Sequence, residues 1–130
     1  MHELLYLKDE QIKAFIEKIF IAYRESFSDS KTALTKHSIG LAHHKVIHLL
    51  SMYNGITISN LLKKLRITKQ SLNRVLNDLI KNEYIFFIKG KKLFYEIFLQ
   101  QKKRIFNALK DSDSDSVIKF KNILNKIINE

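Results

Sequence analysis

The chain contains no proline and only three glycines, Gly40, Gly55 and Gly90. These are the residues that most often interrupt regular structure, so their scarcity predicts long elements that are mostly helical. A length of 130 residues suits one domain with a core of its own. The absence of cysteine excludes a disulfide scaffold and a metal site with cysteine ligands. We therefore expect a single, mainly α-helical domain over residues 1–130.

Apolar side chains recur at spacings of three and four residues over most of the chain, as in helices that bury one face. This pattern predicts helices over residues 9–28, 57–66, 68–82, 100–110 and 117–128, and one that begins at Ser38 or Leu41 and ends at Tyr53. Residues 31–37 are expected to be a connector. The acidic segment 111–116 is expected to be a hinge that also caps the last helix.

Two segments near position 90 depart from the helical pattern. Residues 84–88 and 93–99 are rich in aromatic and β-branched side chains, which favour strands. They flank Lys89-Gly90-Lys91-Lys92, so we expect a small β-hairpin with the lysines at its tip. A short helix, a tight turn at Arg66-Ile67, a second helix and a hairpin form the plan of a winged helix-turn-helix.

The excess positive charge is concentrated in one segment. The chain has a net charge of +10, and residues 57–110 account for all of it, with 13 Lys and Arg against 3 Asp and Glu. The segments before and after are nearly neutral, at +1 and −1. Such concentration is typical of proteins that bind a polyanion, and it therefore favours nucleic acid as the partner.

The predicted helix from Thr68 has an exposed face with unusual chemistry. Its core side centres on Leu72 and Leu79, and its opposite side carries amides, hydroxyls and one arginine, together with Asp78 and Lys81. Amides and arginine form hydrogen bonds with base edges in the major groove. A merely polar, solvated helix is the alternative, and the surrounding charge favours DNA. The residues expected to contact DNA from this helix are Thr68, Lys69, Gln70, Ser71, Asn73, Arg74 and Asn77.

Lysines outside this helix are expected to bind the phosphate backbone. They are Lys63 in the preceding helix and Lys89, Lys91 and Lys92 at the hairpin tip. For the hairpin lysines the alternative role is to protect an edge strand from aggregation.

Residues 39–110 resemble the MarR (multiple antibiotic resistance regulator) family of winged helix-turn-helix transcription regulators. Residues 46–50 resemble the family's second helix, 55–62 the start of its third, and 68–79 its recognition helix. Glu83-Tyr84-Ile85 stands where the family tends to have Gly-Leu-Ile. The short lysine turn lacks the Asp-x-Arg motif of the family's longer wing, so its DNA contact is expected to be less base-specific.

The resemblance implies a homodimer that binds double-stranded DNA. Residues 38–99 would form the winged-helix DNA-binding region, and residues 1–30 and 100–130 a helical dimerisation region. The apolar faces of 9–28 and 117–128 support a dimer independently, because they are large for a small core to cover; packing within one chain is the alternative. A dimer implies a palindromic operator, and we expect a repressor.

Regulators of this kind often bind small aromatic acids, so the resemblance also implies a small-molecule effector. Tyr23, Phe27 and Tyr53 are candidates for lining its pocket, and core packing is the favoured role for each.

Two other binding functions remain as alternatives. His37, His43, His44 and His48 lie close in sequence, and the last two share a helix face at a spacing that can hold zinc, so a metal-sensing regulator is one alternative. Because no third ligand is evident, we expect no metal and no cofactor. A winged-helix module that binds protein without DNA is the other alternative, and the basic segment argues against it.

The remaining classes are disfavoured. The sequence contains no glycine-rich phosphate loop, catalytic metal motif or convincing triad, so we expect no enzyme. It lacks a membrane-length apolar run, and its N-terminus does not resemble a signal peptide, so we expect a cytoplasmic protein without a membrane partner.

Overall fold

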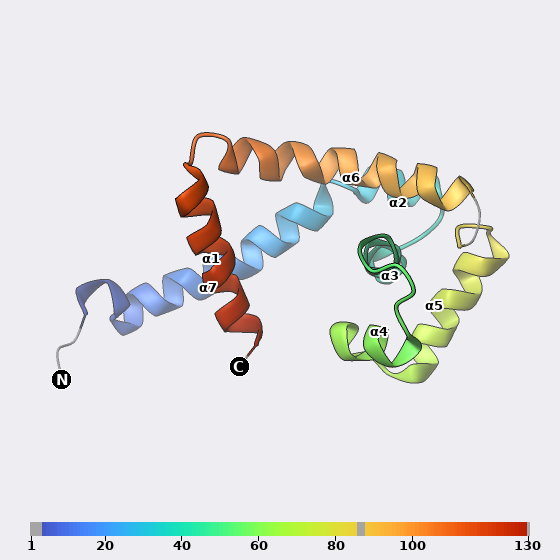
Figure 1. The fold of residues 1–130 in the computed structure, drawn as a ribbon, viewed down its shortest axis with the longest axis horizontal. Coiled ribbons are helices and arrows are strands. Elements are labelled where there is room, and N and C mark those ends of the chain that lie inside the picture. The colour runs from blue at the N-terminus through green and yellow to red at the C-terminus, as the bar shows by residue number, and fades with distance from the viewer. Residues whose placement is uncertain (1–3, 86–87, 130) are drawn as a thin grey trace.

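The computed structural model describes residues 4–85 and 88–129, and every regular element within those ranges is helical (Figure 1). In chain order the elements are the 3-10 turn η1 (Leu5–Leu7) and the helices α1 (Asp9–Ser28), α2 (Lys31–Lys36), α3 (Leu41–Met52), α4 (Ile58–Leu65), α5 (Lys69–Lys81), α6 (Ile88–Leu109) and α7 (Ser114–Ile128). The predicted helices 9–28, 57–66 and 68–82 are confirmed. The expected connector 31–37 was wrong, because a short helix occupies most of it.

One hydrophobic core holds α2 to α5 together with the first half of α6. α5 inserts Leu72, Val75 and Leu79 at helical spacing, so its opposite side is left facing solvent. The buried apolar residues of the core are Ala33, Leu34, Ile39, Val46, Ile47, Leu61, Leu72, Val75, Leu79, Tyr84, Ile85, Leu93 and Ile97. We call residues 31–85, which supply all of these but the last two, the lobe.

The predicted β-hairpin is wrong over the residues that the structure describes. Residues 88–109 form one continuous helix, so 93–99 is helical, and Lys91 and Lys92 lie in its first turns. The expected first strand, 84–88, includes residues 86 and 87, which lie outside the described ranges. The expected helix from 100 to 110 is only the second half of α6.

Burial explains why a helix forms where strand-favouring residues predicted a hairpin. Leu93 and Ile97 are 1% and 0% exposed, whereas Tyr95 between them is 61% exposed. In a strand all three side chains would share one face, but in a helix residues four apart share a face without the one between them. Packing against the core therefore outweighs the local strand preference.

The described part of the connection between α5 and α6 contains one strained residue and one close backbone approach. Glu83 has a φ of 63°, in the left-handed region that favours glycine, and this is where the MarR family tends to have one. At Gly90 an added Cβ would lie 1.7 Å from the backbone oxygen of Tyr84. Only glycine allows the beginning of α6 to approach the chain this closely.

The terminal helices differ from the lobe, because neither α1 nor α7 contains a buried residue. α1 is joined to α6 at one end, where Gln101 donates to the Ser26 carbonyl (2.9 Å) and Arg104 pairs with Asp29. α7 turns away from the end of α6 (Figure 1). Its N-cap is Asp113, whose side chain accepts from the Ser116 N–H at 3.0 Å, which confirms that the acidic segment caps this helix.

Large apolar side chains are exposed along both terminal helices. Those on α1 are Ile12, Phe15, Ile16, Ile19, Phe20 and Tyr23, and those on α7 are Ile118, Phe120, Ile123, Leu124, Ile127 and Ile128. Among the described residues no helix combines the length and the apolar character needed to cross a bilayer.

Candidate nucleic-acid interface

The helix-turn-helix formed by α4 and α5 is defined by its caps. Thr57 begins α4 by accepting from the Asn60 N–H at 3.1 Å, and Thr68 begins α5 by accepting from the Ser71 N–H at 3.1 Å. Between them Arg66 takes a left-handed conformation, with φ 52° and ψ 47°, which ends α4 sharply. The predicted tight turn between two short helices is confirmed.

The exposed side of α5 carries most of the residues that the sequence analysis selected. Lys69, Gln70, Asn73, Arg74 and Asn77 are all exposed, as expected for residues opposite the buried ones. Two of the predicted residues, Thr68 and Ser71, also bond to each other. The hydroxyl of Thr68 donates to that of Ser71 at 2.9 Å, and Ser71 is half-buried, so this pair shapes the start of the helix.

Asp78 was assigned to the same polar face, but the structure places it at the edge of that face. It is half-buried, and its carboxylate lies 3.0 Å from Nε2 of His43 in α3. The sequence did not link His43 to Asp78, because no local pattern connects residues 35 positions apart.

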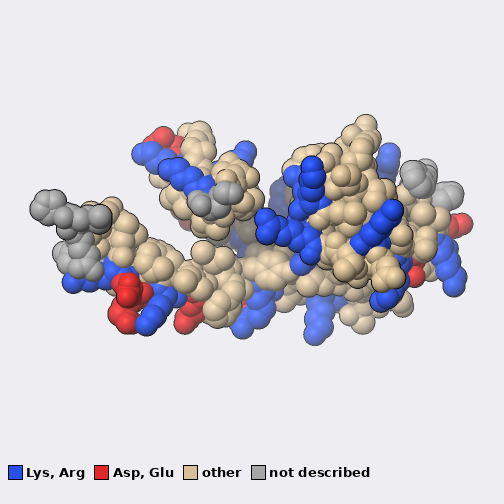
Figure 2. Space-filling view, turned by 90° about the horizontal axis from the view of Figure 1, so that it is seen from below, with Lys and Arg blue, Asp and Glu red and all other residues tan. Residues whose placement is uncertain are grey.

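Basic side chains lie on both helices of the helix-turn-helix. Lys63 and Lys64 lie in the last turn of α4, and Lys81 lies in the last turn of α5. Figure 2 shows Lys and Arg gathered over this half of the molecule, with few acidic groups among them. The ammonium of Lys64 lies 4.4 Å from the ring centre of Tyr53, which holds this charge at the surface.

The lysines predicted at the wing tip now belong to α6. Lys91 and Lys92 are exposed in its first turns. Lys89 lies at the start of the same helix, and the position of its side chain is outside the described part of the structure. The charge is therefore near α5 in sequence, but it is carried by a helix instead of a hairpin.

Each of the four histidines packs or bonds with a different side chain. His37 contacts Glu96 (3.1 Å) and His43 contacts Asp78, while His48 packs edge-on against Phe94. His44 is fully buried beside Ser30, and burial lowers its pKa from 6.5 to about 4. Across residues 4–85 and 88–129 no three His, Cys, Asp or Glu side chains are arranged to hold a metal ion.

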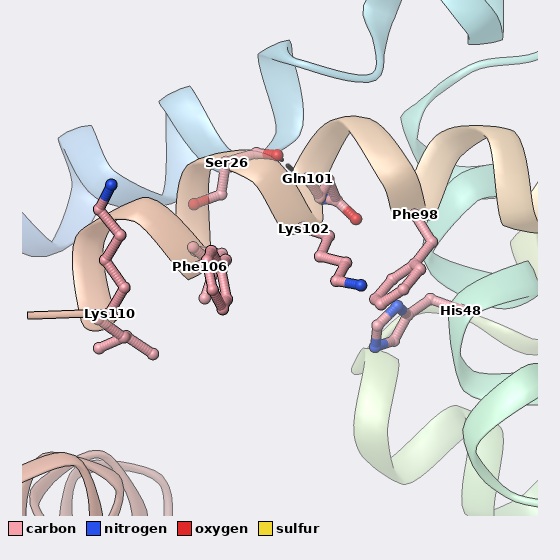
Figure 3. Close-up of a pocket in the computed structure, with 9 residues that line it drawn as sticks. Ser26, His48, Phe98, Gln101, Lys102, Phe106 and Lys110 are labelled. Carbon is pink, nitrogen blue, oxygen red and sulfur yellow. Dashed lines mark hydrogen bonds between the residues drawn. The ribbon is translucent and has the colours of Figure 1, made fainter. Parts of the chain in front are cut away.

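Two apolar cavities lie away from the exposed side of α5. One, of about 590 Å³, is lined by the second half of α6 with Ser26 of α1 and His48 of α3, and Figure 3 shows His48 next to Phe98. The other, of about 450 Å³, includes Tyr23 and Phe27, which the sequence analysis named as pocket candidates. Tyr53 instead lies against Lys64.

The chain was compared with known proteins. A model of the MarR family matches residues 37–89. The HTH-type transcriptional regulator PetP of Rhodobacter capsulatus is 47% identical over 77 residues, which are 59% of this chain and 46% of PetP, so the chain spans about half the length of that relative. The comparison with solved structures gave no match. The matched segment contains the helix-turn-helix of α4 and α5, so this part of the chain is similar to transcription regulators of the MarR family.

Proposed function

We propose that this protein is a sequence-specific double-stranded DNA-binding transcription regulator, and that it acts as a homodimeric repressor on a palindromic operator. The observation that carries this proposal is the exposed side of α5. It presents amides and an arginine on a helix that is capped at its start and fixed by the core behind it. The matched segment of PetP, a named transcriptional regulator, supports the same function.

The proposal divides the DNA contacts among three groups of residues. Gln70, Asn73, Arg74 and Asn77 read base edges, because amides match adenine and arginine matches guanine. Thr68 and Ser71 set the start of the helix and place it against the phosphate backbone of the DNA. Lysines bind phosphates and fix the position of the protein on the duplex. This group comprises Lys63, Lys69, Lys89, Lys91 and Lys92.

The dimer would be formed by the terminal helices. The exposed apolar faces of α1 and α7 are larger than a monomer usually presents to water, and a second copy would cover both. Two-fold pairing would set the two α5 helices roughly 34 Å apart, which is one turn of DNA. We also propose that a small apolar effector binds in one of the two cavities. The protein would be located in the cytoplasm with the DNA.

A binding titration across salt concentration tests DNA binding directly. If lysines and arginines neutralise several phosphates, affinity for duplex DNA falls on the order of a thousandfold between about 50 and 200 mM salt. Affinity that does not depend on salt, or no binding to any duplex, would contradict the proposal and favour a module that binds protein.

Two matched variants test the division of roles. Arg74→Ala should reduce the preference for the selected sequence, because it removes a base contact. Lys63→Ala should weaken binding to all duplexes alike and lower the salt slope by about one. If both variants reduce preference and affinity in the same proportion, the division is wrong.

A further inference from the structure

His43 joins two helices of the lobe through both of its ring nitrogens. Nδ1 lies 3.2 Å from the backbone nitrogen of Gly40, the N-cap of α3, and Nε2 lies 3.0 Å from the Asp78 carboxylate. The Gly40 N–H can only donate, so Nδ1 must accept and carry no hydrogen. Nε2 therefore carries the hydrogen and donates it to Asp78. One tautomer of the neutral ring makes both bonds.

Because of where Asp78 lies on α5, its contact with His43 restrains the rotation of α5 about its own axis. Asp78 directly precedes Leu79, which is fully buried, and it follows Arg74 by one helical turn. It therefore stands between the side of α5 that packs in the core and the side proposed to read DNA. Apolar packing is not directional, whereas a hydrogen bond is. The contact with His43 thus adds a directional restraint to α5.

The same contact determines which partner Asp78 takes. Asp78 and Arg74 are four residues apart on one helix and carry opposite charges, a spacing at which side chains pair. In the structure the Asp78 carboxylate is bonded to His43, and within the described residues Arg74 makes no ion pair. Arg74, which is exposed, is therefore not paired with Asp78.

We propose that His43 is a positioning residue for DNA recognition, which ties Asp78 to the start of α3 and so holds α5 in the rotation that presents Arg74 to the bases. The inference rests on the proposed function, and it adds a residue that does not touch DNA. It also gives His43 a role that its place in the histidine cluster does not suggest.

Four variants separate this role from a general effect on folding. His43→Ala removes both bonds. His43→Gln retains both, because its amide oxygen can accept from Gly40 and its NH₂ can donate to Asp78; glutamine is a common residue at this third helical position. His43→Glu retains the first bond and places a carboxylate against Asp78. Adding Asp78→Asn restores a donor and returns the net charge to that of the wild type.

The first measurement is affinity for a duplex selected by the wild-type protein and for an unrelated duplex. His43→Ala should lose about tenfold in affinity for the selected duplex, with little change for the unrelated one or in the salt slope. His43→Gln and the double variant should stay within about twofold of the wild type. Equal binding by His43→Ala, no rescue by His43→Gln, or parallel weakening on both duplexes would overturn the inference.

The second measurement does not involve DNA. The chain has no cysteine, so spin labels can be placed at two introduced ones, at Met52 in α3 and Ile80 in α5, both exposed. The distance distribution should shift or broaden in His43→Ala and His43→Glu and recover in the other two variants. An unchanged distribution in His43→Ala overturns the inference, whereas failure of the wild type to bind any duplex overturns the proposed function.

Discussion

The lobe and the terminal helices use apolar residues in opposite ways. The lobe encloses its apolar side chains with the first half of α6, whereas α1 and α7 expose theirs along their length. The net positive charge lies in residues 57–110, which contain α4, α5 and α6, whereas the segments that contain α1 and α7 are nearly neutral. In a single copy of the chain the apolar side chains of the lobe are covered, whereas those of α1 and α7 are not. The terminal helices therefore need another apolar surface to cover them.

The largest expected effect comes from truncating the core of the lobe. Leu72→Ala should lower the free energy of unfolding by about 2–5 kcal/mol at any protein concentration, because Leu72 is fully buried. Ile16→Ala on α1 is the matched control, since Ile16 is 57% exposed in a single copy. Chemical denaturation at low concentration measures both. Equal losses would break the distinction between the two regions.

Acid should destabilise the lobe through His44. The Ser30 hydroxyl donates to the Phe27 carbonyl, so Nδ1 of His44 donates to Ser30, and the buried neutral ring has a pKa of about 4 against 6.5 when unfolded. Between these values the unfolded chain binds more protons, so stability is full above pH 6.5 and decreases as the pH falls toward 4, by about 2–3 kcal/mol.

Denaturation of His44→Asn tests this dependence, because its amide can still donate to Ser30 but does not titrate. In this variant the free energy of unfolding should lose most of its dependence on pH between 6.5 and 4. Burial also lowers the pKa of His48, which accounts for a remainder of the same sign. If the variant kept the full pH dependence, the acid sensitivity would come from groups other than His44. Neither α1 nor α7 contains a histidine, so their unfolding should not follow this titration.

The terminal helices should make stability depend on concentration. If α1 and α7 pair two copies, each tenfold dilution lowers the apparent stability of the dimer by about 1.4 kcal/mol. Phe120→Asp on α7 should abolish this dependence and halve the mass measured by light scattering. A wild type whose melting temperature and mass stay constant on dilution would show that these faces are covered in another way.

The smallest expected effect concerns the junction between the two regions. Arg104 in α6 pairs with Asp29 at the end of α1, and this guanidinium holds the pKa of Asp29 below its usual range. Asp29→Asn should lower the melting temperature by no more than about two degrees, because surface ion pairs contribute little. A much larger loss would mean that the junction supports the lobe.

Sequence reasoning succeeded where the determining interactions are local. The tight turn at Arg66-Ile67 and the helical spacing of Leu72 and Leu79 lie within a few residues of what they determine. They predicted the helix-turn-helix and its exposed polar side. α2 was missed because six residues are too few to show a helical period.

The errors came from interactions between distant parts of the chain. Leu93, Tyr95 and Ile97 are compatible with a strand or a helix, and only packing against the lobe distinguishes the two. The contact between His43 and Asp78 likewise depends on how α3 crosses α5. No pattern within either helix indicates it.

Selection of bound duplexes from a random pool by the full chain tests the central claim most directly, because it requires base reading and two copies at once. We expect enrichment of a sequence with two-fold symmetry, with half-sites about one helical turn apart, and loss of that enrichment in Arg74→Ala. Enrichment of no sequence, or of a single site without symmetry that Arg74→Ala still selects, would contradict it.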